Sequence, residues 1–237
     1  MMHLRSALYL LVLVVVTPPY AIFVIGCAWL PRLARWRVIS WWPRFATWLA
    51  RWLLGITYEV EGRGNIPNEP CIILSKHQSA WETLAYNGVF PPHVYVLKRE
   101  LFWIPFLGWG LALYSPIAID RSNRKAAMQR VIDQGRERFK QGFFIMMFPE
   151  GTRVAVGTRK AYRTGGALLA KQLGAQVLPV AHNAGLRWPR NSFLKFPGKV
   201  TVRIGAPIES ADKSPEQLMR QVEEWVETQV AELVAHR

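Results

Sequence analysis

Two short polar blocks carry the residue types that acid–base chemistry and anion binding require. The first is the run KHQSAWE at residues 76–82, which contains His77 and Glu82. Histidine is the usual general base near neutral pH, and a carboxylate can fix its tautomer and stabilise its charged form. Such a pair is a weak signal by itself, because it is more often a surface pair. We predict that His77 lies in a strand–helix turn and that Glu82, on the first helical turns, converges with it on one cleft.

The second block is the run FPEGTR at residues 148–153. Gly151 permits a tight turn, and its amide together with the Arg153 guanidinium suits an anionic oxygen. The block follows the most apolar run of the chain, and α/β proteins place ligands at the ends of such strands. Taken alone, it is equally well interpreted as an ordinary turn.

Two further blocks are less specific. The run IAIDR at residues 117–121 ends in Arg121, which could hold a phosphate or pair with Asp120. The run VLPVAHNAG at residues 177–185 places Pro179 inside an apolar strand, which indicates a sheet edge or a bulge. We interpret His182, in the same run, as a structural histidine with satisfied hydrogen bonds.

These blocks need a scaffold, and short β-rich runs that alternate with helical patterns predict one. The pattern predicts strands at 57–61, 71–75, 93–97, 115–119, 143–148, 177–181 and 200–204, and helices at 79–89, 123–140, 161–173 and 215–236. This alternation is typical of an α/β fold with a mixed, mostly parallel sheet covered by helices on both faces. The wholly apolar run at 143–148 predicts a strand buried on both faces.

The N-terminus has the character of a membrane segment. Residues 6–31 contain no charged side chain, which is long enough for a spanning helix. Pro18 and Pro19 interrupt this run, and proline in a helix removes a hydrogen bond. Two shapes stay open: a single kinked span, or a shallow hairpin of helices at 7–16 and 20–30. The run VIGC at 24–27 resembles a lipoprotein processing site, but the apolar stretch continues past it and we expect no cleavage.

The following segment, residues 30–54, interleaves five tryptophans with five arginines, and no acidic residue precedes Glu59. Tryptophan and arginine favour the lipid headgroup region. The alternative is a basic helix packed on its own domain. We predict an N-terminal membrane-anchoring helical segment at 1–55 and a catalytic domain at 56–237. The arginine excess after residue 31 indicates that this side faces the cytoplasm.

The composition limits the classes of partner that the chain is expected to bind. The 237 residues carry a formal charge of +14 and are 51% hydrophobic, so the chain should contact nucleic acid or a phospholipid surface. The Trp/Arg cluster beside a membrane-length apolar run favours the phospholipid membrane, and we expect no nucleic acid partner. Two cysteines exclude a disulfide scaffold and a four-cysteine zinc site.

Taken together and in this order, the blocks resemble the glycerolipid acyltransferase family over roughly residues 57–208. FPEGTR is a specific motif of that family, which is also characterised by a His, four residues and an Asp; here Glu82 stands in the place of the Asp. The resemblance implies acyl transfer from a thioester to a lysolipid hydroxyl. His77 would take the hydroxyl proton and Glu82 would orient His77, with no acyl-enzyme, metal or cofactor.

The resemblance also implies the substrate-binding residues. Those associated with the acceptor are Lys98, Arg121, Glu150, Gly151, Thr152 and Arg153, and Pro179 matches a motif assigned to the acyl side. The implied reaction uses acyl-CoA or acyl-carrier protein and acylates the sn-2 hydroxyl of lysophosphatidic acid (1-acylglycerol 3-phosphate) to phosphatidic acid. The expected location is the bacterial inner membrane, with the catalytic domain on the cytoplasmic side.

Two alternatives stay open. Within the enzyme class, the acceptor could be another lysolipid or glycerol 3-phosphate itself, because these enzymes share the motifs. From a different class, the chain could be a non-catalytic basic membrane-binding protein.

Overall fold

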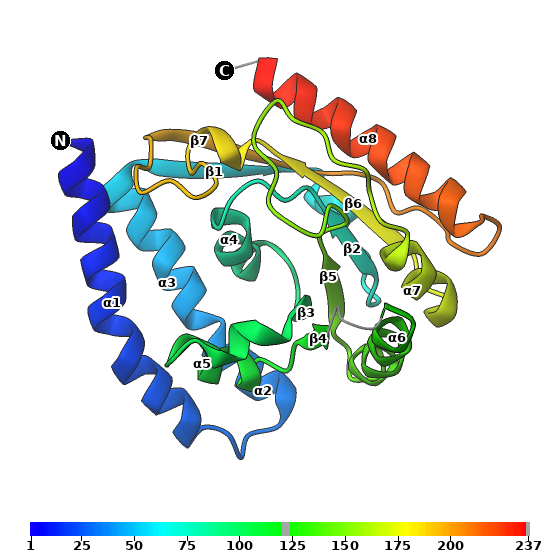
Figure 1. Ribbon diagram of the computed structural model, residues 1–237, viewed down its shortest axis with the longest axis horizontal. Coiled ribbons are helices and arrows are strands. Elements are labelled where there is room, and N and C mark those ends of the chain that lie inside the picture. The colour runs from blue at the N-terminus through cyan, green and yellow to red at the C-terminus, as the bar shows by residue number, and fades with distance from the viewer. Residues whose placement is uncertain (120–123, 236–237) are drawn as a thin grey trace.

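A seven-stranded sheet runs through the protein, whose computed structural model describes residues 1–119 and 124–235 (Figure 1). Its strands lie in the order β1-β7-β6-β2-β5-β3-β4. The β6–β7 pair is antiparallel and the other neighbouring pairs are parallel. The strands are β1 (Ile56–Glu61), β2 (Ile72–Ser75), β3 (His93–Lys98), β4 (Ile117–Ile119), β5 (Phe144–Met147), β6 (Val177–His182) and β7 (Gly198–Ile204). The expected mixed, mostly parallel sheet is therefore confirmed.

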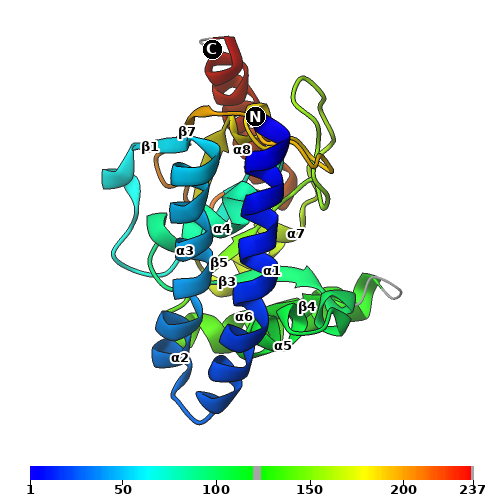
Figure 2. The same cartoon turned by 90° about the vertical axis from the view of Figure 1, so that its left-hand side faces the viewer.

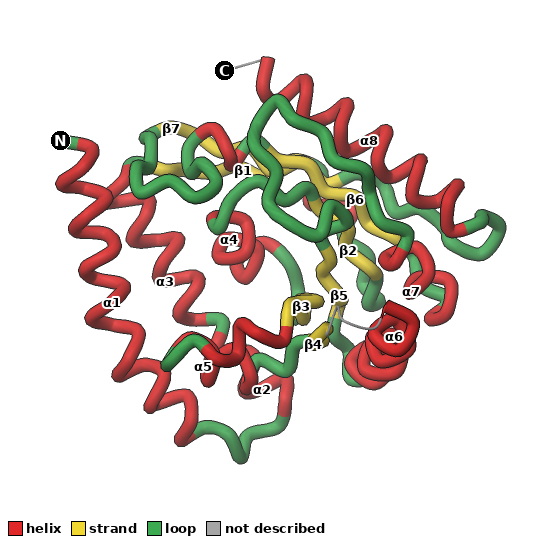
Figure 3. The backbone as a smooth tube through the Cα atoms, viewed as in Figure 1, coloured by secondary structure: helices red, strands yellow, loops and turns green. Residues whose placement is uncertain are grey.

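Helices cover both faces of this sheet (Figures 1 and 3). On one face lie α6 (Arg124–Lys140), α7 (Gly165–Leu173) and α8 (Pro215–Ala235), which pack against β4, β5, β2 and β6. On the other face lies α4 (Trp81–Val89), next to α3 (Trp41–Leu49). β5 is covered from both sides, and Ile145 and Met146 are fully buried as predicted.

Two helices differ from the expectation. The helix predicted from residue 161 begins only at Gly165, because the Arg163 amide donates to the Pro149 carbonyl at 3.0 Å and holds this stretch against the preceding turn. α5 (Leu107–Leu113) was not predicted. Its sequence, LGWGLAL, contains two glycines, which cost helical stability that only tertiary packing can replace.

Pro179 does not lie on a sheet edge, because β6 pairs with β2 on one side and with β7 on the other. The other half of that expectation, a bulge, is confirmed. Val180 pairs with Ile204, but Val177 pairs with Ile208, so one extra residue is inserted opposite the proline. The bulge lets the sheet accommodate a residue that has no N–H to donate.

The N-terminal segment starts with one continuous helix, α1 (Met2–Gly26), with Pro18 and Pro19 inside it. The shallow hairpin of helices at 7–16 and 20–30 is therefore wrong. The chain reverses after α1 and returns through α2 (Arg32–Ile39), α3 and the π-helical turn η1 (Ala50–Leu54), so that α1 and α3 lie side by side (Figure 2). Within the described ranges, α1 is the one helix long and apolar enough to cross a membrane.

The arginines of this segment divide into two groups. Arg35 donates to the Leu113 carbonyl at 2.7 Å, Arg44 donates to the Asn87 carbonyl at 2.7 Å, and Arg32 pairs with Glu137. These three hold the segment on its own domain, as the alternative interpretation expected. Arg37 and Arg51 are exposed to solvent.

Trp36 connects α2 to the sheet and generates a stability prediction. It is 3% exposed, and its indole N–H is shared between the His93 carbonyl at 2.8 Å and the Tyr114 hydroxyl at 2.7 Å. We expect Trp36→Phe to lower the free energy of unfolding by about 1–3 kcal/mol, because buried acceptors lose their donor. Thermal unfolding followed by circular dichroism in micelles measures this. Trp48→Phe is the matched control, since Trp48 is 55% exposed; equal effects of the two changes would contradict the prediction.

Candidate active site

The sheet brings the two polar blocks together. β2 and β5 are parallel neighbours, with Leu74 opposite Met147, so the turns that follow them leave the same edge. β3 pairs with the other side of β5 and ends at Lys98. Residues that follow adjacent parallel strands are therefore placed around one crevice, as α/β topology requires.

His77 and Glu82 meet within this crevice. His77 Nδ1 lies 2.8 Å from Glu82 Oε1, as the sequence predicted. The same carboxylate oxygen accepts the backbone N–H groups of Gln78, at 3.0 Å, and Ser79, at 2.8 Å. Glu82 stands in the first turn of α4, where the helix dipole also favours a negative charge. The longer side chain of glutamate thus still reaches the imidazole.

The environment of Glu82 keeps it ionised. Burial alone would raise the pKa of this fully buried carboxyl, but the neighbouring histidines His182 and His77 and the amide hydrogen bonds outweigh burial and hold the pKa below its usual value. An ionised Glu82 accepts a hydrogen bond from the Nδ1–H group, so the Nδ1–H tautomer of His77 is favoured and Nε2 is left as the basic nitrogen.

The His77 ring is also held from the side. It stacks on Phe148, the first residue of FPEGTR, with ring centroids 3.9 Å apart and planes inclined by 14°. The Val154 amide donates to the His77 carbonyl at 2.8 Å, so the two turns are joined through the backbone as well. His77 lines a cavity whose walls come from several elements. Since Nδ1 is bound to Glu82, Nε2 is the ring nitrogen available to a molecule in that cavity.

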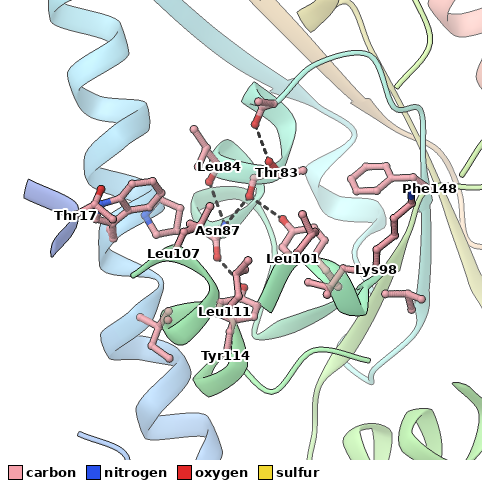
Figure 4. Close-up of a pocket in the computed structure, with 18 of the residues that line it drawn as sticks. Thr17, Thr83, Leu84, Asn87, Lys98, Leu101, Leu107, Leu111, Tyr114 and Phe148 are labelled. Atoms are coloured by element: carbon pink, nitrogen blue, oxygen red, sulfur yellow. Dashed lines mark hydrogen bonds between the residues drawn. The ribbon is translucent and has the colours of Figure 1, made fainter. Parts of the chain in front are cut away.

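This cavity has a volume of about 710 Å³ and mostly apolar walls (Figure 4). The walls come from elements far apart in sequence: α1, α3, α4, β3 and α5. Representative lining residues are Thr17, Leu84, Leu97, Leu107 and Leu111. The N-terminal segment therefore builds part of the same cavity that His77 faces, which the sequence alone did not indicate.

Basic and polar groups lie at the end of the cavity near the two turns. Four of the predicted substrate-binding residues line it: Lys98, Gly151, Thr152 and Arg153. Gly151 has a φ of +69°, a left-handed conformation that favours glycine and makes the sharp turn possible. Arg153 Nε is buried without a hydrogen-bond partner in the described part of the chain, so a donor is available there to an anionic oxygen.

Three of the predicted substrate-binding residues are not placed on the cavity. Glu150 is buried behind the turn, where its Oε1 accepts the His77 amide at 3.2 Å. Burial raises the pKa of Glu150, partly opposed by the charge of Lys76. The Pro179 ring lies within β6 close to Gly205, next to the Trp225 side chain of α8. Direct substrate contact is therefore not supported for Glu150 or Pro179, and Arg121 lies outside the described residues.

The sequence analysis did not identify three residues next to the site. The missed residues are Lys76, Tyr162 and Glu227, which form a buried polar cluster behind the two turns. In the sequence, only the position of Lys76 next to His77 could have suggested this cluster.

His182 is structural, as interpreted. Its Nδ1 accepts the Ala184 amide at 3.1 Å, its Nε2 lies 2.9 Å from the Lys76 carbonyl, and burial lowers its pKa.

The fold and the site agree with the comparisons with known proteins. The family model described as Acyltransferase matches residues 57–183, which contain both turns. The chain belongs to this acyltransferase family. It is 48% identical over 208 residues to 1-acyl-sn-glycerol-3-phosphate acyltransferase of Pseudomonas aeruginosa, covering 86% of this chain and 81% of that protein.

A more distant relative matches a smaller share of this chain. The protein of the same name from Saccharomyces cerevisiae is 30% identical over 172 residues, covering 70% of this chain and 56% of the yeast protein. Among solved structures, the 1-acyl-sn-glycerophosphate (LPA) acyltransferase PlsC of Thermotoga maritima superposes with a TM-score of 0.81 at 26% identity. That superposition covers 98% of this chain and 95% of the other. The likeness thus includes the N-terminal helices as well as the sheet.

Proposed function

We propose that this acyltransferase transfers an acyl group from a thioester to the sn-2 hydroxyl of 1-acylglycerol 3-phosphate, and so forms phosphatidic acid. The observation that carries the proposal is His77, oriented by a buried glutamate, on an apolar cavity with basic groups at one end. The relatives named above act on this acceptor by name, and the acyltransferase of Pseudomonas is similar over most of its length.

The proposed reaction begins when Nε2 of His77 takes the proton of the acceptor hydroxyl. The hydroxyl oxygen attacks the thioester carbonyl and forms a tetrahedral intermediate. Its collapse breaks the carbon–sulfur bond, and the imidazolium returns the proton to the leaving thiolate. Glu82 stabilises the imidazolium throughout by its charge-assisted hydrogen bond to Nδ1. The chain itself forms no covalent bond in this scheme.

The basic end of the cavity is the proposed site of the acceptor phosphate. Arg153 offers an unpaired Nε–H there, and Lys98 adds a positive charge at the end of β3. Gly151 and Thr152 belong to the same turn and line the same cavity end. The apolar walls suit fatty acyl chains, so head and tail of a lysolipid would find matching surroundings at opposite ends of one cavity.

We further propose that the N-terminal segment, residues 1–55, anchors the protein to the cytoplasmic surface of the inner membrane. The outer face of α1 exposes large apolar side chains, among them Leu11 and Val15, at 58% and 62%. The other face is bound to the protein: Tyr9 donates to the Ala46 carbonyl at 3.1 Å, and Val24 is buried. Because the Tyr9 ring packs edge-on against Trp188 and α1 also contacts α5 of the domain, we infer that α1 lies along one leaflet.

The donor is proposed to be acyl-CoA or acyl-carrier protein, both of which carry the acyl group as a thioester and are cytosolic. No further cofactor takes part in the proposed scheme. The decisive experiment incubates purified protein with lysophosphatidic acid and each donor, and measures phosphatidic acid by mass spectrometry. Lysophosphatidylcholine and glycerol 3-phosphate serve as competing acceptors; preferential acylation of either would replace the acceptor proposed here.

The base and its partner are tested by three substitutions. His77→Ala should lower turnover by about 10²–10⁴-fold because it removes the general base. Glu82→Gln should be nearly as harmful, since a neutral amide cannot stabilise the imidazolium, whereas Glu82→Asp should keep much of the activity. Turnover is measured together with a melting curve for each variant. A Glu82→Gln enzyme as active as the wild type would remove the pair from the mechanism.

The phosphate site is tested at Arg153. Lysine keeps the charge but not the forked hydrogen bonds, each worth about 1.5–3 kcal/mol to a charged partner. We therefore expect Arg153→Lys to raise the KM for lysophosphatidic acid at least about tenfold, with the donor KM little changed. Arg220→Lys on exposed α8 is the control. A loss of thermal stability with equal effects on both substrates would instead assign Arg153 to the fold.

Membrane anchoring is tested on the exposed face of α1. Wild-type protein should stay with membranes through a carbonate wash. Leu11→Asp combined with Val15→Asp should shift it to the soluble fraction, because two charges would have to enter the apolar region. Gln221→Asp with Thr228→Asp, on exposed positions of α8, is the matched control. Retention of the α1 variant at wild-type level would show that another surface carries the binding.

A further inference from the structure

Directly behind the His77 turn, a lysine is buried between two carboxylates. Lys76 is 1% exposed, and its ammonium group donates to Glu227 Oε1 at 2.6 Å and lies 3.4 Å from Glu150 Oε1. Glu227 comes from α8, on the opposite face of the sheet from α4 (Figure 1). Its Oε1 also accepts the Tyr162 hydroxyl at 2.9 Å. Burying these charges is costly unless each is paired, so their arrangement is tightly constrained.

The cluster is joined to the backbone of both turns. The carboxylate oxygen of Glu150 that faces Lys76 also accepts the His77 amide, at 3.2 Å. The Lys76 carbonyl lies 2.9 Å from His182 Nε2. Glu150 in turn opens the segment that carries Gly151 and Arg153. The position of one ammonium group therefore determines where the Glu150 carboxylate lies, and with it the spacing of the two turns.

Glu227 fixes that ammonium group from the other side. Without its charge, Lys76 would have Glu150 as its remaining close carboxylate and would move toward it. The Glu150 oxygen could then no longer accept the His77 amide and contact the ammonium group in the present geometry. Arg159, whose Nε lies 3.8 Å from Glu227 Oε2, is largely exposed and holds Glu227 only weakly.

We propose that Glu227 is a positioning residue for acyl transfer: through Lys76 it sets the orientation of His77 and of the turn from Glu150 to Arg153. Glu227 contacts no substrate in this proposal, which rests on the function proposed above. The C-terminal helix is then part of the catalytic apparatus, although it lies across the sheet from the cavity that His77 faces.

The test is a double-mutant cycle on the full-length enzyme in micelles. Glu227→Gln keeps the shape and should lower kcat about tenfold, since small displacements of reacting groups cost this much or more. The KM for lysophosphatidic acid should rise as well, because the turn that carries Arg153 shifts, whereas the donor KM should change less than about twofold. Glu224→Gln, the same change at an exposed position of α8, should have no effect. Because Glu227 acts through Lys76, the double variant with Lys76→Met should be no slower than Lys76→Met alone.

Several results would overturn this proposal. One is a wild-type kcat for folded Glu227→Gln enzyme, with only its melting temperature lowered. Another is a double variant whose losses multiply, because Glu227 would then act independently of Lys76. If Glu227→Gln does not fold, Tyr162→Phe removes one donor to Glu227 and should lower kcat about threefold; an unchanged kcat would count against the proposal. Wild-type enzyme is assayed first, so that failure of the acyl transfer itself is recognised separately.

Discussion

The site depends on the parallel pairing of β2 with β5. Because Leu74 lies opposite Met147, both strands end at the same edge, and their turns are joined by the hydrogen bond from the His77 amide to Glu150. No local interaction within either turn could produce this arrangement, since His77 and Glu150 are 73 residues apart and two further strands lie between them in the sequence. The buried apolar run of β5 supplies the burial energy that keeps the pairing in register, and a register shift would reverse its faces.

The N-terminal segment has two faces of different character. Its outer face is apolar and exposed, whereas its inner face completes the cavity wall with residues such as Thr17 and Val24. Hydrogen bonds from Arg35 and Trp36, and the edge-on contact of the Tyr9 ring with Trp188, hold it to the domain at separate points. A lipid acceptor bound in this cavity would therefore lie against the same helix whose outer face we propose to meet the membrane. The proposed anchor and the cavity therefore share α1, and a boundary at residue 55 does not divide them. The polar motifs of the site nevertheless all lie after that residue.

The sequence predicts what local patterns determine. All seven strands were predicted from β-rich runs, and the start of α8 follows from its capping box, in which Ser214 and Gln217 exchange hydrogen bonds at 2.8 and 3.1 Å. The His77–Glu82 contact was predictable because both residues lie in one strand–helix turn. The path of α1 through its prolines, the helix α5 and the Lys76–Glu227 pair depend on contacts between distant segments, 151 residues apart in the last case. Such contacts leave no periodic trace in the sequence.

The distribution of buried charge supports the assignment of the site on physical grounds alone. Within the described chain, the buried Lys, Arg, Asp and Glu side chains are Lys76, Glu82, Arg138, Glu150 and Glu227. Four of these five surround the His77 turn, although burying a charge costs far more than burying an apolar group. A fold under selection for stability alone has no reason to concentrate that cost at one point. A site that must hold an imidazole against a carboxylate in a fixed orientation has such a reason. The opposite directions of the Glu82 and Glu150 pKa values show that the two carboxyls, both within reach of His77, are held in different environments. The histidines and the amide hydrogen bonds outweigh burial and lower the pKa of Glu82, whereas burial raises the pKa of Glu150 and the charge of Lys76 opposes this only in part.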